Sequence, residues 1–150
     1  MSAINEIRQL KHAGEEIVFT NGCFDLLHPG HLDYLHKARA LGNVLVVGLN
    51  TDKSVSRLKG PSRPINKLIF RQTMLEGLKS VDFVIPFNED TPLELIKQVQ
   101  PDFLVKGGDY TPKQVVGHQE IVQWGGQTII LPFLDGYSST SIIEHIKSLP

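Results

Sequence analysis

The sequence predicts an α/β fold built on a five-stranded parallel sheet with helices on both faces. Five short apolar runs rich in β-branched residues alternate with segments whose apolar residues recur every three or four positions. The run at 43–50 is almost continuously apolar, a pattern typical of a strand covered on both faces. Because a chain of 150 residues suits one folding unit, we expect a single domain over 1–150.

The first part of the chain predicts a strand–helix–strand unit. Residues 4–13 carry apolar side chains at helical spacing, and the apolar run at 17–19 predicts a short buried strand. Every third residue from 32 to 41 is apolar, which predicts a helix that Gly42 ends. The strand at 43–50 follows, and such a crossover is right-handed by default.

The stretch after this strand is basic. From Lys53 to Arg71 there are six basic residues and no acidic one: Lys53, Arg57, Lys59, Arg63, Lys67 and Arg71. The sequence Gly60-Pro61-Ser62-Arg63-Pro64 within it predicts a turn or loop. Directly after a strand end, this patch favours polyphosphate binding over the alternative, a solvated basic loop. A helix over 68–78 and a strand over 81–86, ended by Pro86, are expected next.

A helix over 91–99 is then expected, with Thr91 as N-cap, Pro92 in the first turn and Glu94 in the capping-box position. An apolar run at 102–106 predicts the fourth strand. This strand leads into a glycine pair, where the backbone can approach a ligand closely.

The last elements are a helix over 114–124, a strand over 127–132 and a helix over 141–148. The expected strand order, 3-2-1-4-5, describes a Rossmann-like, doubly wound sheet. Ligands of such sheets bind at the carboxyl ends of the strands, near the point where the order reverses.

The histidine loop, residues 20–31, joins the central strand to its helix and would lie at this point. Pro29 and Gly30, between His28 and His31, fit the first turn of that helix, where unpaired backbone N–H groups attract anions. Phosphate is the expected guest. The two imidazoles can donate hydrogen bonds to charge that builds on its oxygens.

Two other interpretations of His28 and His31 remain open. The pair could bind a metal, but zinc needs three or four ligands, and the single cysteine, Cys23, lies on the strand side of the loop. We therefore expect no metal held by protein side chains. Each histidine could also be structural or solvated, although two of them beside a glycine at a strand end favour a ligand site.

The end of the last expected strand carries a second phosphate candidate. Ser138, Ser139 and Thr140 precede the final helix, where hydroxyl and N–H groups can hold a terminal phosphate. A simple N-cap is the alternative for this trio.

Composition excludes several other classes of function. Hydrophobic residues make up 41% of the chain and the net charge is −1, so nothing favours a nucleic-acid or membrane partner. One cysteine excludes an internal disulfide framework and suits a reducing compartment. The N-terminus has no signal-peptide pattern and no apolar run reaches membrane-spanning length, so we expect a cytoplasmic protein.

These groups predict phosphate chemistry without a covalent step. Cys23 has no legible Cys-His-Asn arrangement, so there is no convincing nucleophile. Positioning and charge stabilisation remain, as in direct nucleotidyl transfer. The histidines would stabilise the α-phosphoryl oxygens, while Lys59 and Arg71 would neutralise the triphosphate and the departing pyrophosphate. Mg²⁺ would accompany the triphosphate, held largely by phosphate oxygens and water.

The chain also resembles a known family. Asn21-Gly22-Cys23-Phe24-Asp25 followed by His28-Pro29-Gly30-His31 is similar to the G-x-F-D and H-x-G-H signature of the cytidylyltransferase-like nucleotidyltransferases. Residues 58–64, 104–110 and 139–140 resemble one branch, the D-glycero-β-D-manno-heptose 1-phosphate adenylyltransferases. That resemblance implies ATP and heptose 1-phosphate as substrates, ADP-heptose and pyrophosphate as products, and a homodimer.

The resemblance implies roles for single residues. His28, His31 and Lys59 match residues that serve the transfer. The expected nucleotide site consists of Asn21, Gly22, Cys23, Phe24, His28, His31, Arg71, Gly107, Asp109, Ser138, Ser139 and Thr140. The expected contacts to the sugar phosphate do not come from the resemblance; they are Asp25 and Lys106, which follow strand ends, and Arg63 of the basic stretch.

The last loop bears on the choice of nucleotide. Cytidylyltransferases carry Arg-Thr-Glu-Gly-Ile-Ser-Thr-Thr where this chain has residues 133–140 without the arginine, which favours ATP over CTP. Two alternatives stay open. One is transfer to another small phosphate, such as glycerol 3-phosphate, and the other is a regulatory nucleotide-binding module without turnover.

Overall fold

The sheet has the predicted order, β3-β2-β1-β4-β5, and every neighbouring pair is parallel. We describe it from a computed structural model that covers all residues, 1–150. The strands are β1 (Ile17–Gly22), β2 (Val44–Asn50), β3 (Phe83–Phe87), β4 (Phe103–Gly107) and β5 (Gln127–Leu131). The predicted α/β fold class is confirmed.

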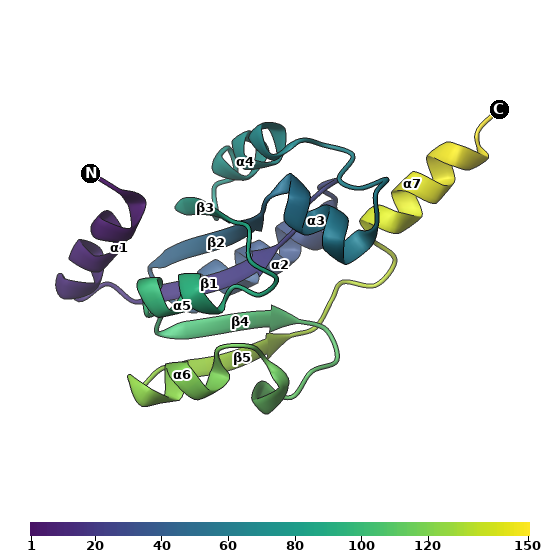
Figure 1. Cartoon of the computed structure of the whole chain (residues 1–150). Coiled ribbons are helices and arrows are strands. Elements are labelled where there is room, and N and C mark those ends of the chain that lie inside the picture. Colours follow the sequence, from purple (N-terminus) through teal and green to yellow (C-terminus); the bar gives the residue numbers. More distant parts are fainter.

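Helices connect successive strands and cover both faces of the sheet (Figure 1). They are α1 (Ala3–His12), α2 (Pro29–Arg39), α3 (Asp52–Lys59), α4 (Leu68–Glu76), α5 (Leu93–Val99), α6 (His118–Gln123) and α7 (Ser139–Ser148), with a short 3-10 turn, η1 (Pro112–Gln114). No helix is both long enough and apolar enough to cross a lipid bilayer. In Figure 1, α7 extends beyond the carboxyl ends of the strands.

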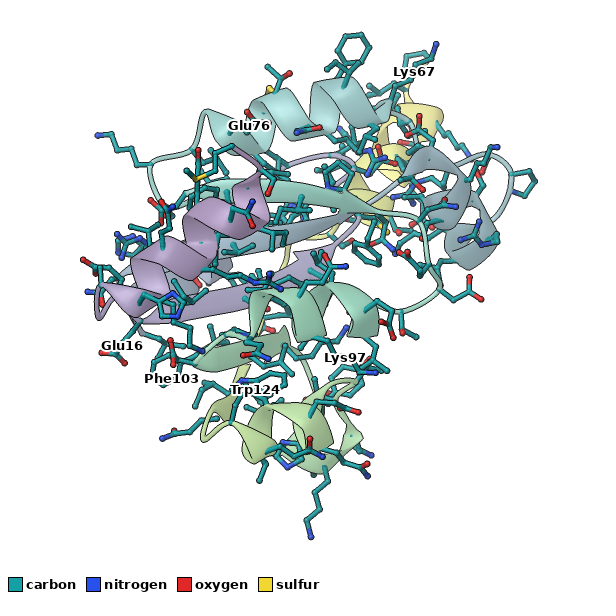
Figure 2. The ribbon with its side chains drawn as sticks, turned by 60° about the vertical axis from the view of Figure 1, so that its left-hand side comes forward. Glu16, Lys67, Glu76, Lys97, Phe103 and Trp124 are labelled. Carbon is teal, nitrogen blue, oxygen red and sulfur yellow. The ribbon has the colours of Figure 1, made fainter.

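Each face of the sheet has its own buried core. Ile7 of α1, Ile96 of α5 and Ile121 of α6 pack on one face against strand residues such as Phe19. Figure 2, turned to bring α1 forward, shows these three helices on the same side of the sheet. On the other face α2 and α4 pack through buried apolar side chains, including Leu35 and Leu75. Because both faces are covered, the strand at 44–50 is buried throughout, as its apolar run predicted.

The sheet opens between β1 and β4. These strands pair only at Val18↔Phe103 and Phe19↔Leu104, whereas β1 stays paired with β2 as far as Gly22. Beyond the last pair, the hydroxyls of Thr20 and Tyr34 lie 3.1 and 3.2 Å from the Val105 carbonyl and 2.7 Å from each other. This is the point where the strand order reverses, and the crevice opens here.

Four local expectations were wrong. Residues 52–59 form helix α3, with Thr51 as N-cap, where no helix was expected. Pro86 lies inside β3 instead of ending it, which an edge strand tolerates because no partner needs its missing N–H. Helix α5 begins at Leu93 without a side-chain cap, so Thr91 is not its N-cap. The helix expected over 114–124 is shorter, because Gly117 has a φ of 94° and interrupts it before His118.

Candidate active site

A cavity of about 490 Å³ lies at the carboxyl edge of the sheet, in the crevice between β1 and β4. Its lining comes from the histidine loop, α3 and the loop after it, the end of β4, and the segment that leads into α7. The sequence-predicted residues that line it are Asn21, Cys23, Phe24, Asp25, His28, His31, Lys59, Arg63, Lys106, Gly107, Ser138, Ser139 and Thr140. Gly22, Arg71 and Asp109 are not among the lining residues.

The two histidines stack at the N-terminus of α2. His28 is the N-cap, and its Nδ1 accepts a hydrogen bond from the backbone N–H of His31 at 3.3 Å. The ring centroids are 3.7 Å apart with an interplanar angle of 24°. Because Nδ1 of His28 accepts this bond, the proton of the neutral ring lies on Nε2, which is then a donor.

Both imidazoles are held in the neutral form. Burial, and secondly the neighbouring His28, lower the pKa of His31 to about 4. Burial also lowers the pKa of His28. At neutral pH the pair therefore offers uncharged N–H donors, and it avoids two cations in stacked contact. Nδ1 of His31 is buried without a hydrogen-bond partner, which is unusual outside functional sites.

These pKa shifts predict a loss of stability in mild acid. Because the folded-state pKa of His31 lies below its unfolded value of 6.5, the unfolded state binds the proton more readily. The stabilisation is complete above pH 6.5 and is lost as the pH falls from 6.5 towards 4. We expect the Tm of the wild-type protein to fall over this pH range. The Tm of His31→Gln should depend less on pH. If Tm fell equally with pH in both proteins, the lowered pKa of His31 would be contradicted.

Gly30 brings the backbone close to the histidine pair. A Cβ at this position would lie 2.9 Å from the imidazole of His28, so a side chain here would displace the ring. Pro29 has no N–H, and the N–H of His31 already bonds to His28. The N–H of Gly30 is thus the free donor at this helix end, where the macrodipole favours an anion.

Asp25 is occupied by the protein itself. It is 3% exposed, and its carboxylate accepts bonds of 2.8 Å from Arg63 Nε and from the N–H groups of Ile65 and Asn66. Burial raises the pKa of Asp25, but these N–H groups and the guanidinium outweigh it, so the pKa lies below its ordinary value. Although Asp25 borders the cavity, its carboxylate fastens the loop after α3 rather than being free for a sugar phosphate.

Arg71 is also committed elsewhere, contrary to its expected contact with the nucleotide. The side chain is fully buried, and it donates to the carbonyls of Cys23, Asn50 and Asn66 and to the carboxylate of Asp52. Each of its three nitrogens is thus bonded to protein oxygen. Arg57 is also unavailable to a phosphate, because it pairs with the carboxylate of Asp90.

Three basic side chains remain at the cavity. Lys59, the last residue of α3, is exposed and has no ion-pair partner. Arg63 keeps its terminal nitrogens free of hydrogen bonds while its Nε pairs with Asp25. Lys106 of β4 places its ammonium 5.4 Å from the centre of the Tyr110 ring. The first two lie on the α3 side of the histidines, and Lys106 lies on the β4 side.

The N-terminus of α7 closes the far side of the cavity. Ser138 is its N-cap and accepts from the N–H of Ser141 at 3.0 Å, so the simple cap is present. The hydroxyl of Ser139 donates to the Leu26 carbonyl at 2.8 Å and ties α7 to the histidine loop. The hydroxyl of Thr140 makes no hydrogen bond within the protein. A phosphate here would meet the first N–H groups of α7 and this hydroxyl.

Burial keeps Cys23 out of the chemistry. Burial raises the pKa of the Cys23 thiol, and the nearby Lys59 and Arg71 lower it by less. The thiol form therefore predominates at neutral pH, and a thiol is a poor nucleophile.

Comparison with known proteins identifies the family. A sequence model described as cytidylyltransferase-like matches residues 19–145. The chain belongs to the cytidylyltransferase-like family. It is 55% identical over 141 residues to the "Bifunctional protein HldE" of Marinomonas sp. (strain MWYL1) and 56% identical over 142 residues to that of Haemophilus ducreyi. These matches cover 94–95% of this chain but only 30% of the length of each relative.

Solved structures agree with the cytidylyltransferase-like fold. The lipopolysaccharide core biosynthesis protein from Thermoplasma volcanium superposes with a TM-score of 0.67 at 29% identity, covering 83% of this chain and all of that one. Pantothenate synthetase from Thermus thermophilus has a TM-score of 0.59 at 17% identity and covers 96% of this chain and 69% of its own, a likeness of fold alone.

The cytidylyltransferase-like cavity contains aromatic residues that the sequence analysis missed. Phe133 is 66% exposed and lies against Gly107, where a Cβ would come within 2.5 Å of its ring. Tyr34 lies beneath, with ring centroids 6.5 Å apart, and Tyr137 stacks 6.1 Å from His28. The signal for Phe133 was present, since it stands where the cytidylyltransferase block has arginine. Gly22 lies against Phe24, and a Cβ there would come within 2.9 Å of that ring.

Proposed function

We propose that this chain is a nucleotidyltransferase that transfers AMP from ATP to D-glycero-β-D-manno-heptose 1-phosphate, giving ADP-heptose and pyrophosphate. The observation that carries the reaction class is the neutral, stacked pair of His28 and His31 at the N-terminus of α2, inside the cavity. Membership of the cytidylyltransferase-like family and the likeness to HldE support the proposal.

The reaction would be a direct in-line displacement. An oxygen of the sugar phosphate attacks the α-phosphorus of ATP and forms the new P–O bond, while the α,β-bridging bond breaks and its electron pair leaves with pyrophosphate. The attacking phosphate is already ionised near pH 7, so no strong general base is needed. The N–H donors of His28, His31 and Gly30 would stabilise charge on the α-phosphoryl oxygens.

The charged ends of the cavity would position the two substrates. Lys59 and Arg63 lie together on the α3 side and suit the polyphosphate and the acceptor phosphate. On the β4 side, Phe133, Tyr34 and Gly107 offer flat apolar surface for the nucleoside. Phe133 in place of the arginine of the cytidylyltransferase block supports ATP over CTP.

Mg²⁺ would enter with the triphosphate. No group of three or more His, Cys, Asp or Glu side chains is arranged to hold a metal, and the carboxylate of Asp25 is already bonded on both oxygens. A cation held by phosphate oxygens and water needs no such group, and its charge would offset that of the triphosphate.

A substrate panel tests the proposal. We expect pyrophosphate release with ATP and heptose 1-phosphate, and much less with CTP or with glycerol 3-phosphate. Asn21 and Lys106 line the cavity and can bond the hydroxyls of a heptose, which glycerol 3-phosphate offers in smaller number. Strong turnover of CTP with glycerol 3-phosphate would overturn the substrates but keep the reaction class. No release across the panel would favour a regulatory nucleotide-binding module.

A further inference from the structure

We propose that Arg71 is a positioning residue that holds Lys59 and Arg63 in register with the histidine loop, and is not a phosphate ligand. The proposal rests on the function proposed above, because it concerns the same cavity. It is carried by the pattern of bonds around one buried guanidinium, which connects three separate parts of the chain.

The Arg71 guanidinium bonds to both ends of the segment 52–66, which carries Lys59 and Arg63. Its Nη2 donates to Asp52 Oδ1 at 2.7 Å, and Asp52 is the first residue of α3. Its Nε donates to the Asn66 carbonyl at 2.9 Å, just beyond the loop that follows α3. Lys59 and Arg63 lie between these two anchors, so their backbone is fixed from both sides.

The same guanidinium also bonds to the backbone just after β1 and at the end of β2. Nη1 donates to the Cys23 carbonyl at 2.9 Å and to the Asn50 carbonyl at 2.8 Å. Cys23 belongs to the histidine loop and Asn50 ends β2. One rigid planar group thus sets the distance between the histidine loop and the 52–66 segment. A lysine at this position could not do so, because its flexible ammonium cannot bond four acceptors that lie in different directions.

Asn66 and Asp25 complete the connection. Asn66 gives its carbonyl to Arg71, its N–H to the Asp25 carboxylate at 2.8 Å and its side-chain amide to the Asp25 carbonyl at 3.0 Å. Ser56 of α3 donates to the Arg63 carbonyl and pins the loop onto its own helix. Every bond of Arg71 goes to protein oxygen, and the residue is 1% exposed. The buried charge is therefore used to assemble the cavity wall.

The test is a double-mutant cycle with Arg71→Lys and Lys59→Ala, measured both as kcat/KM and as ATP affinity by calorimetry. Arg71→Lys should lower kcat/KM about tenfold to a hundredfold, since misplacement by about 1 Å can reduce a rate about 10²-fold. In the Lys59→Ala background the same change should cost several-fold less, because only Arg63 then remains on that segment for Arg71 to position. Arg39→Lys is the matched control, since Arg39 also bonds a carboxylate and a carbonyl, at the opposite edge of the sheet.

Two results would overturn the proposal that Arg71 positions the basic residues. One is a double variant whose loss of kcat/KM equals the product of the two single losses, and the other is an Arg71→Lys protein with wild-type activity. If Arg71→Lys does not fold, Asp52→Asn enters the same cycle, because it removes the charge of one partner at a half-exposed site and so weakens its bond to Arg71. If the wild-type protein binds ATP but shows no turnover, coupling in the ATP affinities still supports positioning while the proposed transfer fails.

Discussion

Replacing His31 by alanine is expected to lower kcat about 10²–10³-fold while changing ATP affinity little, since losing one preorganised donor to a developing oxyanion has that effect. His31 is neutral and partly buried in the cavity, so its N–H is oriented before the substrate arrives. Steady-state kinetics with ATP and heptose 1-phosphate, together with calorimetric ATP binding, give the two quantities separately.

Two variants control this result. His28→Asn keeps an acceptor at the N-cap, with an amide oxygen in place of Nδ1, so a loss of rate there reports on the imidazole rather than on the helix cap. His36→Ala removes an exposed histidine from the last turn of the same helix and should be silent. If His31→Ala and His28→Asn both retain near wild-type kcat, the histidines do not stabilise the transition state.

Lys59→Ala is expected to lower kcat/KM roughly 10- to 150-fold. This corresponds to a loss of about 1.5–3 kcal/mol of transition-state stabilisation, the range of a charge-assisted hydrogen bond. Lys59 reaches the cavity without an ion-pair partner, so its charge is free for phosphate. The measurement is kcat/KM for ATP at low and moderate salt, because a single direct contact depends on salt less than a diffuse field does.

Lys67→Ala is the control for charge alone. Lys67 precedes α4, is exposed and extends away from the body of the protein (Figure 2). It came from the same basic stretch of the sequence but does not line the cavity. Equal losses from Lys59→Ala and Lys67→Ala would mean that the patch attracts phosphate as a general field and that Lys59 makes no specific contact.

The parallel sheet could be predicted because it depends on local patterns, and its strand order followed from the doubly wound arrangement expected of such a sheet. The nearly unbroken apolar run at 44–50 reports burial on both faces, and alternating helices require parallel crossovers. Helix α3 was missed although Thr51 caps it and Val55 is buried within it, because the basic residues around them dominated the interpretation. A short helix with few apolar residues gives a weak periodic signal.

The histidines could be predicted as part of a site because the loop, the helix start and the imidazoles are adjacent in sequence. Arg71 and Asp25 could not be interpreted in the same way. The bonding partners of Arg71 at Cys23 and of Asp25 at Asn66 lie 48 and 41 residues away, and only the fold brings them together. A charge count records Arg71 as a free cation, whereas its position in the interior makes it a neutralised part of the structure.

The most direct test of the proposed transfer is the fate of label from ATP. Purified protein, Mg²⁺ and heptose 1-phosphate would be incubated in parallel with α-labelled and γ-labelled ATP. Direct adenylyl transfer predicts the α label in ADP-heptose and the γ label in pyrophosphate, with no label on the protein. Label from the γ position in the sugar product, or α label bound to the protein as an obligatory intermediate, would contradict the mechanism.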